Sequence, residues 1–182
     1  MNETSNLSFK NIVISGDVGT GTSTLAKGLA RKLGWQYLSA GNFFRSWFKE
    51  QNIPLWNKAE IPDEIDKKID YEFLEKMKDE EHIVFDSHYG GWFARDLPDV
   101  FRILLICNPQ VATQRILNRE HTHKETLEEI EERRRQLRAK FKKLYSGDDY
   151  EDPKYFHLVL DSGNTGVEEE VATALAKFQA TT

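Results

Sequence analysis

Five short runs of apolar, β-branched or aromatic residues occur along the chain, each about the length of a β-strand. They cover residues 11–15, 35–39, 82–86, 101–106 and 156–160. Stretches with apolar residues at helical spacing lie between them. Strands that alternate with helices predict a parallel sheet with right-handed crossovers and helices on both faces, which is an α/β fold.

The stretches between the predicted strands differ in length. Residues 23–33 and about 109–119 predict single helices, and residues 165–168 resemble a capping box at the start of a last helix. Two stretches do not fit a simple alternation of one strand and one helix. Residues 41–80 predict an insertion of about two helices, and residues 122–145 predict one long charged helix.

The composition is that of one ordinary globular domain, with 182 residues, 39% hydrophobic and 30% charged. The net charge of −5 argues against nucleic acid as a partner. No apolar run approaches the roughly 20 residues of a membrane span. A single cysteine and a polar N-terminus suit the cytosol. We expect a cytoplasmic, monomeric protein that binds small molecules and neither nucleic acid nor a membrane.

The segment after the first predicted strand carries a chemical signal. In Gly-Asp-Val-Gly-Thr-Gly-Thr-Ser-Thr (16–24), Gly16, Gly21 and Ser23 occupy three of the four fixed positions of the motif Gly-x-x-x-x-Gly-Lys-Ser/Thr. Glycines let backbone N–H groups converge on phosphate oxygens, and the helix that follows points its positive end at the same anion. A phosphate-binding loop is therefore predicted; a glycine-rich turn without a ligand is the alternative.

The position of the predicted loop indicates which residues bind ATP and its metal ion. The expected ATP-binding residues are Gly16, Asp17, Val18, Gly19, Thr20, Gly21, Thr22, Ser23 and Thr24. The Ser23 hydroxyl is the expected ligand of Mg²⁺. The motif's lysine is absent, because Thr22 stands at its position. Some of the positive charge that stabilises the transition state must therefore come from elsewhere.

A basic region later in the chain can supply that charge. Residues 115–143 contain ten Lys/Arg and six Glu. Arg133 and Arg134 interrupt the apolar stripe of the long helix, so one of them is expected to face the cleft. Arg115 and Arg119 are expected near the same mouth. We predict catalytic roles for Arg115, Arg119 and Arg133 in closing over the phosphoryl group; pairing with glutamates on the same helix is the alternative.

The segment after the second predicted strand suggests a site for a second phosphate. Ser39, Gly41 and Arg45 lie at the carboxyl edge of the sheet, where α/β folds bind ligands. A guanidinium there can hold a monophosphate with two parallel hydrogen bonds, and an exposed surface arginine is the alternative. Asp66 and Asp70 share one helix face and could accept hydrogen bonds from a base or ribose, or form a solvated acidic face.

The third predicted strand ends in a further candidate segment. Asp86, at its carboxyl end, is a predicted catalytic residue that can hold Mg²⁺ through water or orient the acceptor. Gly91 belongs to a glycine pair that permits a tight turn beneath a ligand. His88 could contact the acceptor phosphate, although such a histidine is often structural. His88 and Gly91 therefore join the predicted acceptor site.

Taken together, these segments resemble those of cytidylate kinases, within the P-loop nucleoside monophosphate kinases. The resemblance covers nearly the whole chain and rests on Gly-Thr-Gly-Thr-Ser-Thr-Leu-Ala-Lys (19–27), Ser-Ala-Gly-x-x-Phe-Arg (39–45), Ile-Asp-x-x-Ile-Asp (65–70), Gly-Gly-Trp (90–92), Arg-x-x-x-Arg-Glu (115–120) and Thr-Leu-Glu-Glu-Ile (126–130). The phosphate loop is common to many families, whereas the second and third segments are more specific.

The resemblance implies a three-layer P-loop NTPase fold and a reaction. The implied divisions are a core (8–40, 81–119, 146–182), an acceptor-binding insertion (41–80) and a lid (120–145). The implied reaction is Mg²⁺-dependent transfer of the γ-phosphoryl group of ATP to CMP or dCMP. On this pattern Arg45 holds the acceptor phosphate, Arg133 matches the arginine of the lid helix, and Asn164 belongs to a segment that lines the adenine pocket.

Two departures from the pattern leave other functions open. Thr22 resembles the archaeal-type branch of the family, but His88 stands where these kinases typically have an arginine. A neutral histidine holds a phosphate less strongly than a guanidinium does. A kinase for another small acceptor, or a nucleotide-binding regulator without catalysis, would also fit the loss of cations at these two positions.

Overall fold

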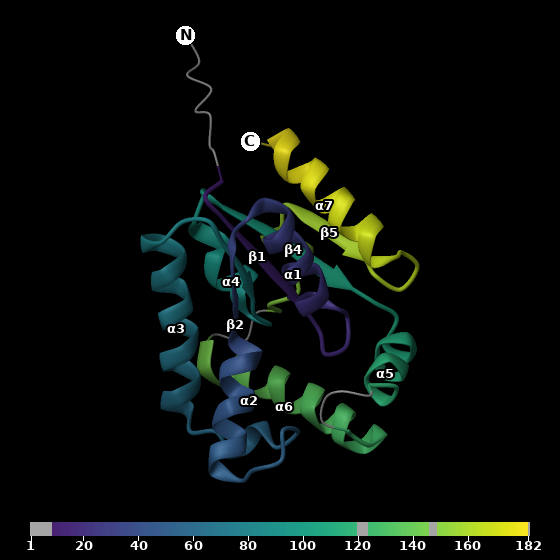
Figure 1. The fold of residues 1–182 in the computed structure, drawn as a ribbon. Coiled ribbons are helices and arrows are strands. Elements are labelled where there is room, and N and C mark those ends of the chain that lie inside the picture. Colours follow the sequence, from purple (N-terminus) through teal and green to yellow (C-terminus); the bar gives the residue numbers. More distant parts are fainter. Residues whose placement is uncertain (1–8, 120–123, 146–148, 182) are drawn as a thin grey trace.

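The computed structural model describes residues 9–119, 124–145 and 149–181 and contains one five-stranded parallel sheet (Figure 1). Its strand order is β2-β3-β1-β4-β5. The strand bounds are Asn11–Gly16 (β1), Gln36–Ser39 (β2), Ile83–Asp86 (β3), Val100–Ile106 (β4) and Leu158–Asp161 (β5). All five predicted strands are confirmed, with ends that shift by one or two residues.

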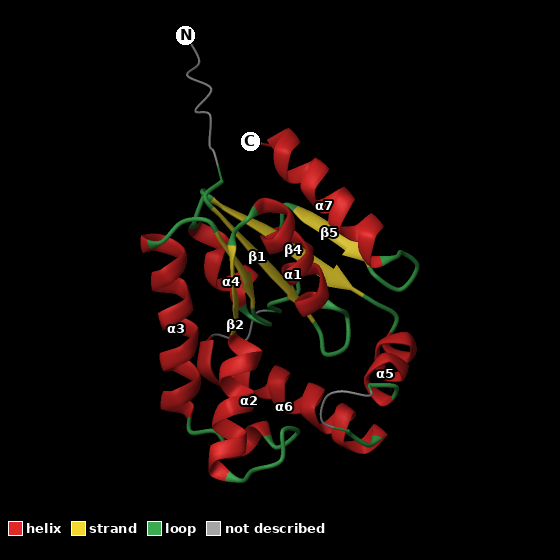
Figure 2. Cartoon of the chain, in the orientation of Figure 1, coloured by secondary structure: helices red, strands yellow, loops and turns green. Residues whose placement is uncertain are grey.

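Helices cover both faces of the sheet, as Figure 2 shows. Successive strand residues point to opposite faces. Ile12 and Ile14 of β1 therefore pack in one core with residues of α1 (Thr22–Leu33) and α7 (Val167–Thr181). Val13 packs in a second core, formed with residues of α3 (Asp63–Asp79) and next to α4 (Gly90–Phe93). The predicted three-layer α/β fold is confirmed.

Two helical additions lie toward the carboxyl ends of the strands. The first comprises α2 (Ala40–Gln51), a 3₁₀ turn η1 (Lys58–Glu60) and α3. The second comprises α5 (Pro109–Leu117) and α6 (Leu127–Tyr145), which follow β4. Figure 1 shows α6 passing below the strand ends, between α2 and α5. Two further 3₁₀ turns are η2 (Ala94–Asp96) and η3 (Pro153–Tyr155).

Local sequence signals account for several helix ends. The Asn108 side chain accepts a hydrogen bond from the Gln110 N–H (2.9 Å), and Pro109 is the first residue of α5. The capping box predicted at residues 165–168 is wrong. The Thr165 hydroxyl instead contacts the Asp161 carbonyl (2.9 Å) and the Glu170 carboxylate (3.1 Å), and α7 begins at Val167.

The boundaries of the predicted subdivisions are only partly covered by the structure. Residues 120–123, where the predicted lid begins, and residues 146–148, where the last core segment begins, lie outside the described residues. Of the helices that the structure describes, none has both the length and the apolar character to cross a membrane.

Candidate active site

The phosphate loop connects β1 to α1 at the centre of the sheet. Gly19 and Gly21 have φ angles of 86° and 98°. Residues with a Cβ rarely adopt this region, so the loop conformation depends on glycine at both positions. A Cβ at Gly19 would also lie 2.6 Å from the Ala112 carbonyl oxygen. The backbone therefore folds as the motif predicts.

One cavity lies against this loop and the carboxyl ends of β1 and β3. Its walls come from the loop, α2, the segment around η1, α3, the segment after β3, the segment after α5, and α6. The predicted site residues that line it are Asp17, Val18, Gly19, Gly21, Thr22, Ser23, Gly41, Arg45, Asp70, Asp86, His88, Arg119 and Arg133. The structure thus brings residues predicted for the donor site, the acceptor site and the lid together around one space.

A hydroxyl and a carboxylate meet at the base of the cavity. Ser23 donates a hydrogen bond from Oγ to Asp86 Oδ2 (2.5 Å). Tyr37 and Ser39 donate to the same oxygen, at 3.0 and 3.2 Å. These are the hard oxygen ligands that Mg²⁺ prefers, and they lie beside the phosphate loop. The residues present therefore fit a Mg²⁺ ion.

Three arginines from separate elements line the cavity. Arg45 comes from α2, Arg119 follows α5, and Arg133 comes from α6. Burial lowers the pKa of Arg133 to about 10, although Glu125, 3.2 Å away, raises it. Arg119 and Arg45 lower it further because their charges are close. Three cations in one cavity repel one another and favour a bound polyanion.

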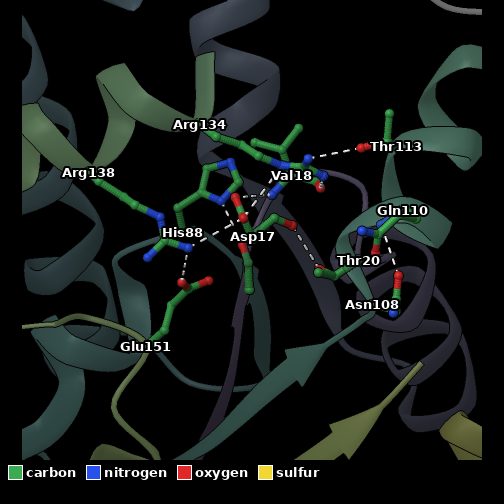
Figure 3. Close-up of polar contacts among 11 residues, drawn as sticks. Asp17, Val18, Thr20, His88, Asn108, Gln110, Thr113, Arg134, Arg138 and Glu151 are labelled. Atoms are coloured by element: carbon green, nitrogen blue, oxygen red, sulfur yellow. Dashed lines mark hydrogen bonds and ion pairs between the residues drawn. The ribbon is translucent and has the colours of Figure 1, made fainter. Parts of the chain in front are cut away.

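Arg134, the neighbour of Arg133, contacts the phosphate loop (Figure 3). Its guanidinium donates to the Val18 carbonyl (3.0 Å) and to the Thr113 hydroxyl (2.9 Å). Its Nε lies 3.5 Å from Asp17 Oδ2. Arg133 is therefore the arginine that faces the cavity, whereas Arg134 contacts the phosphate loop.

Asp66 and Asp70 occupy different environments although they share a helix face. Asp70 lines the cavity and accepts a hydrogen bond from the Tyr145 hydroxyl (2.7 Å). Asp66 is 1% exposed, and its two oxygens pair with Lys58 and Lys140. The structure therefore corrects the prediction for Asp66: both oxygens are already paired, and it does not reach the cavity.

The segment after β3 contacts the loop from below. His88 lines the cavity, and its Nδ1 lies 2.7 Å from the Gly16 carbonyl oxygen. Burial lowers the pKa of His88, which favours the neutral ring. Gly91 does not line the cavity. It packs directly against the Phe156 ring, and its N–H donates to Ser15 Oγ (2.9 Å), so the predicted ligand contact is corrected to a packing contact.

The other predicted site residues lie beside the cavity without lining it. Ser39 caps α2 by accepting from the Asn42 N–H (3.3 Å). Arg115 donates to Ser162, at 3.2 Å to the hydroxyl and 2.5 Å to the carbonyl. Asn164 contacts Asp161 (3.2 Å) in the same loop after β5. The remaining residues, Gly16, Thr20 and Thr24, are phosphate-loop positions that do not border this space.

Several cavity residues were missed by the sequence analysis. They are Ala40, Phe44, Phe48, Leu55, Lys58, Ser87, Tyr89 and Leu137. Lys58 is buried, with Nζ 3.5 Å from the centre of the Phe44 ring. Burial lowers the pKa of Lys58. A lone lysine in a polar stretch gives no sequence signal of this kind, whereas aromatic Phe44 beside Arg45 could have been proposed.

The buried carboxyl of Asp70 predicts a pH-dependent stability. Burial raises its pKa from 3.8 to about 7, although the Tyr145 hydrogen bond opposes the shift. Between these values the folded chain keeps a proton that the unfolded chain loses, so this contribution to stability falls as pH rises from about 4 to about 7, by at most about 1.4 kcal/mol per pH unit, and levels off above that. In urea unfolding from pH 5 to 8, Asp70→Asn should gain stability relative to wild type as pH rises.

The control for this experiment is Asp96→Asn, a carboxylate whose side chain is 84% exposed. Its unfolding free energy should follow that of wild type at every pH. Parallel profiles for Asp70→Asn and wild type would contradict the raised pKa.

The groups around the cavity suit the binding of a polyanion. The loop presents N–H groups, Ser23 and Asp86 suit Mg²⁺, and three guanidiniums face the same space. Phosphoryl transfer relies on such positioning and electrostatics. The fold and the site therefore define a P-loop kinase.

A solved structure of a gluconokinase from Sinorhizobium meliloti shares this fold, with a TM-score of 0.65 at 17% identity over 94% of this chain and 92% of that one.

Sequence comparisons define the family more narrowly. Residues 12–138 match a family model described as an AAA domain. A cytidylate kinase of Sulfurisphaera tokodaii is 36% identical over 162 residues, which are 87% of this chain and 89% of that protein. A cytidylate kinase of Sulfolobus acidocaldarius is 39% identical over 155 residues, 83% of this chain and 84% of that protein. The chain belongs to the cytidylate kinase family.

Proposed function

We propose that this protein transfers the γ-phosphoryl group of ATP to CMP or dCMP and forms ADP and the nucleoside diphosphate. The observation that carries the proposal is a single cavity shared by the phosphate loop, Arg45 of α2 and Arg133 of α6. This arrangement suits a donor phosphate chain and an acceptor phosphate placed end to end. The relationship to cytidylate kinases supports cytidine nucleotides as acceptors.

The donor half of the site is assigned to the loop and its surroundings. The loop N–H groups and the start of α1 bind the ATP phosphates. Ser23 and Asp86 would hold Mg²⁺, which would neutralise charge on the phosphates. Arg115, for which a catalytic role was predicted, does not line the cavity and contacts Ser162 in the loop after β5. Arg115 and Asn164 of that loop are assigned to the adenine end of ATP.

The acceptor half is assigned to the helical insertion. Arg45 and Gly41 at the start of α2 bind the acceptor phosphate, with Ser39 capping the helix beneath them. Phe44 forms an apolar wall on which a base can stack. Asp70 lines the cavity on that side and can hydrogen-bond to the base. Arg119 and Arg133 lie between the two halves, where the phosphoryl group moves.

A coupled assay with ATP, Mg²⁺ and a panel of CMP, dCMP, UMP and AMP tests this function. CMP or dCMP should give the highest kcat/KM. Tight ATP binding without turnover of any acceptor would instead indicate a regulator. Turnover of a non-nucleotide acceptor, with none of CMP, would indicate a kinase for another small molecule.

Replacing Arg45 with alanine is expected to raise the KM for CMP by about 10- to 100-fold, because hydrogen bonds to a charged group contribute about 1.5–3 kcal/mol. The KM for ATP should change less than twofold, since Arg45 lies on the acceptor side of the cavity. Lys49→Ala, one turn later on α2 and exposed, is the control. An unchanged KM for CMP would show that the acceptor phosphate binds elsewhere.

Three broader features stay predictions. The chain is expected to act in the cytoplasm and as a monomer. The division into a core, an acceptor-binding insertion at 41–80 and a lid at 120–145 is also proposed.

A further inference from the structure

Three carbonyl groups at alternate positions of the phosphate loop are held by side chains from three other elements. The Gly16 carbonyl contacts His88 Nδ1 at 2.7 Å. The Val18 carbonyl accepts from Arg134 Nη2 at 3.0 Å, and the Thr20 carbonyl accepts from Ser162 Oγ at 2.7 Å. Since a carbonyl oxygen can only accept, His88 must carry its proton on Nδ1. Figure 3 shows Arg134 and His88 approaching the loop from the side of α6 and β3.

These contacts set the direction of the loop's N–H groups. Across a trans peptide bond, a carbonyl and the next N–H point in opposite directions, and the chain has no cis peptide bond among its described residues. Holding the carbonyls of residues 16, 18 and 20 therefore turns the N–H groups of Asp17, Gly19 and Gly21 away from the three side chains. None of the described residues accepts a hydrogen bond from the Gly19 or Gly21 N–H. Both glycines line the cavity.

The charge of Arg134 has a second consequence. Asp17 is an acidic residue of the loop that lines the cavity, where it would repel phosphates. Arg134 and Arg138 pair with its Oδ2 at 3.5 and 3.4 Å, and Arg138 also pairs with Glu151 at 2.7 Å (Figure 3). The helix α6 thus neutralises the acidic residue of a loop that lacks a lysine of its own at position 22.

We propose that His88, Arg134 and Ser162 are positioning residues that hold the phosphate loop in its anion-binding conformation before the nucleotide binds. The inference rests on the proposed function, because it takes ATP as the ligand of the loop. It assigns His88 to the donor side of the cavity, although the sequence predicted that His88 contacts the acceptor phosphate. This chain lacks the lysine of the loop motif, and its loop is held by side chains from other parts of the fold.

The experiment measures binding of MgATP and of CMP separately, by calorimetry, to the full chain. His88→Leu, Arg134→Gln and Ser162→Ala should each raise the Kd for MgATP about tenfold, the effect of losing one hydrogen bond to a loop that must then order itself. The Kd for CMP should stay within twofold. His88→Asn, whose amide offers an N–H close to the position of Nδ1, should restore most of the ATP affinity. Arg134→Lys should restore part of it.

Arg135→Gln is the matched control on α6, because Arg135 is 70% exposed and pairs with Glu132 of the same helix. It should leave both affinities unchanged. A second readout follows the Gly19 and Gly21 amide signals by NMR, which should shift when MgATP binds to wild type. In His88→Asn those shifts should be preserved. In His88→Leu both signals should already differ from wild type without nucleotide, because the loop loses its order.

Two results would overturn the inference while leaving the proposed function in place. One is an ATP affinity within twofold of wild type in all three variants. The other is a loss of CMP affinity in His88→Leu with ATP affinity unchanged, which would make His88 an acceptor ligand. If wild type itself does not bind MgATP, the proposed function fails together with the inference.

Discussion

Replacing Arg133 with glutamine is expected to lower kcat for CMP phosphorylation by about 10³-fold. The guanidinium lines the cavity next to Arg119 and is held near Glu125, so on the proposed function it lies where the phosphoryl group is transferred. Its pKa of about 10 keeps it charged at pH 7. Because the charge it stabilises develops in the transition state, KM for ATP and CMP should change far less than kcat. Steady-state kinetics with both substrates varied measure this.

The neighbouring arginines provide the controls for this variant. Arg135→Gln removes an exposed guanidinium from the same helix and should leave kcat within twofold. Arg133→Lys keeps the charge but loses the planar fork, and should give an intermediate kcat. If Arg133→Gln folds normally and loses less than tenfold in kcat, the catalytic cation must be another residue.

Replacing Asp66 with asparagine is expected to lower the free energy of unfolding by about 3–5 kcal/mol and Tm by about 10 °C. Asp66 is buried between Lys58 of the insertion and Lys140 of α6, and Lys140 also donates to the Ile61 carbonyl. Without the carboxylate, two ammonium groups stay buried without a full counter-charge. Urea unfolding at pH 7 measures the change. Burial already lowers the pKa of Lys58, so Lys58 loses its proton as pH rises. The loss of unfolding free energy should therefore be smaller at higher pH.

Two further variants test whether the buried charges cause the loss of stability: one breaks an exposed ion pair, and the other replaces all three buried charged residues with apolar ones. Glu72→Gln breaks an exposed pair with Lys68 and should cost less than about 0.5 kcal/mol. The triple variant Lys58→Met, Asp66→Leu, Lys140→Met removes all three charges and should recover most of the stability lost in Asp66→Asn. A loss below 1 kcal/mol in Asp66→Asn would contradict the interpretation.

The fold could be predicted because its signals are local. Each strand is a short apolar run, and the loop glycines and Pro109 mark turns and helix starts. The exact ends of the strands could not be predicted from the sequence, because they depend on hydrogen bonds to the neighbouring strand. β2 begins at Gln36, which pairs with Ile83 of β3, whereas Trp35 donates its N–H to the end of α1 (2.9 Å). Trp35 is apolar like the strand residues, but its backbone hydrogen bond goes to α1, so it lies outside the strand.

The site was only partly predictable, because identical local patterns have different neighbours. Asp66 and Asp70 share a helix face, but Lys140, 74 residues away in sequence, pairs with Asp66 and leaves Asp70 to line the cavity. Arg133 and Arg134 are adjacent, and the rotation of about 100° per helical residue directs them to different partners. No spacing in the sequence distinguishes these cases.

The sequence by itself determined the parallel sheet and the phosphate loop, because each depends on backbone conformation or periodicity within a few residues. The tertiary structure decided which cations reach the cavity and what holds the loop. The loop carbonyls contact side chains 72, 116 and 142 residues away. Such contacts depend on how β3, α6 and β5 pack against β1, and they exist only once the whole chain has folded.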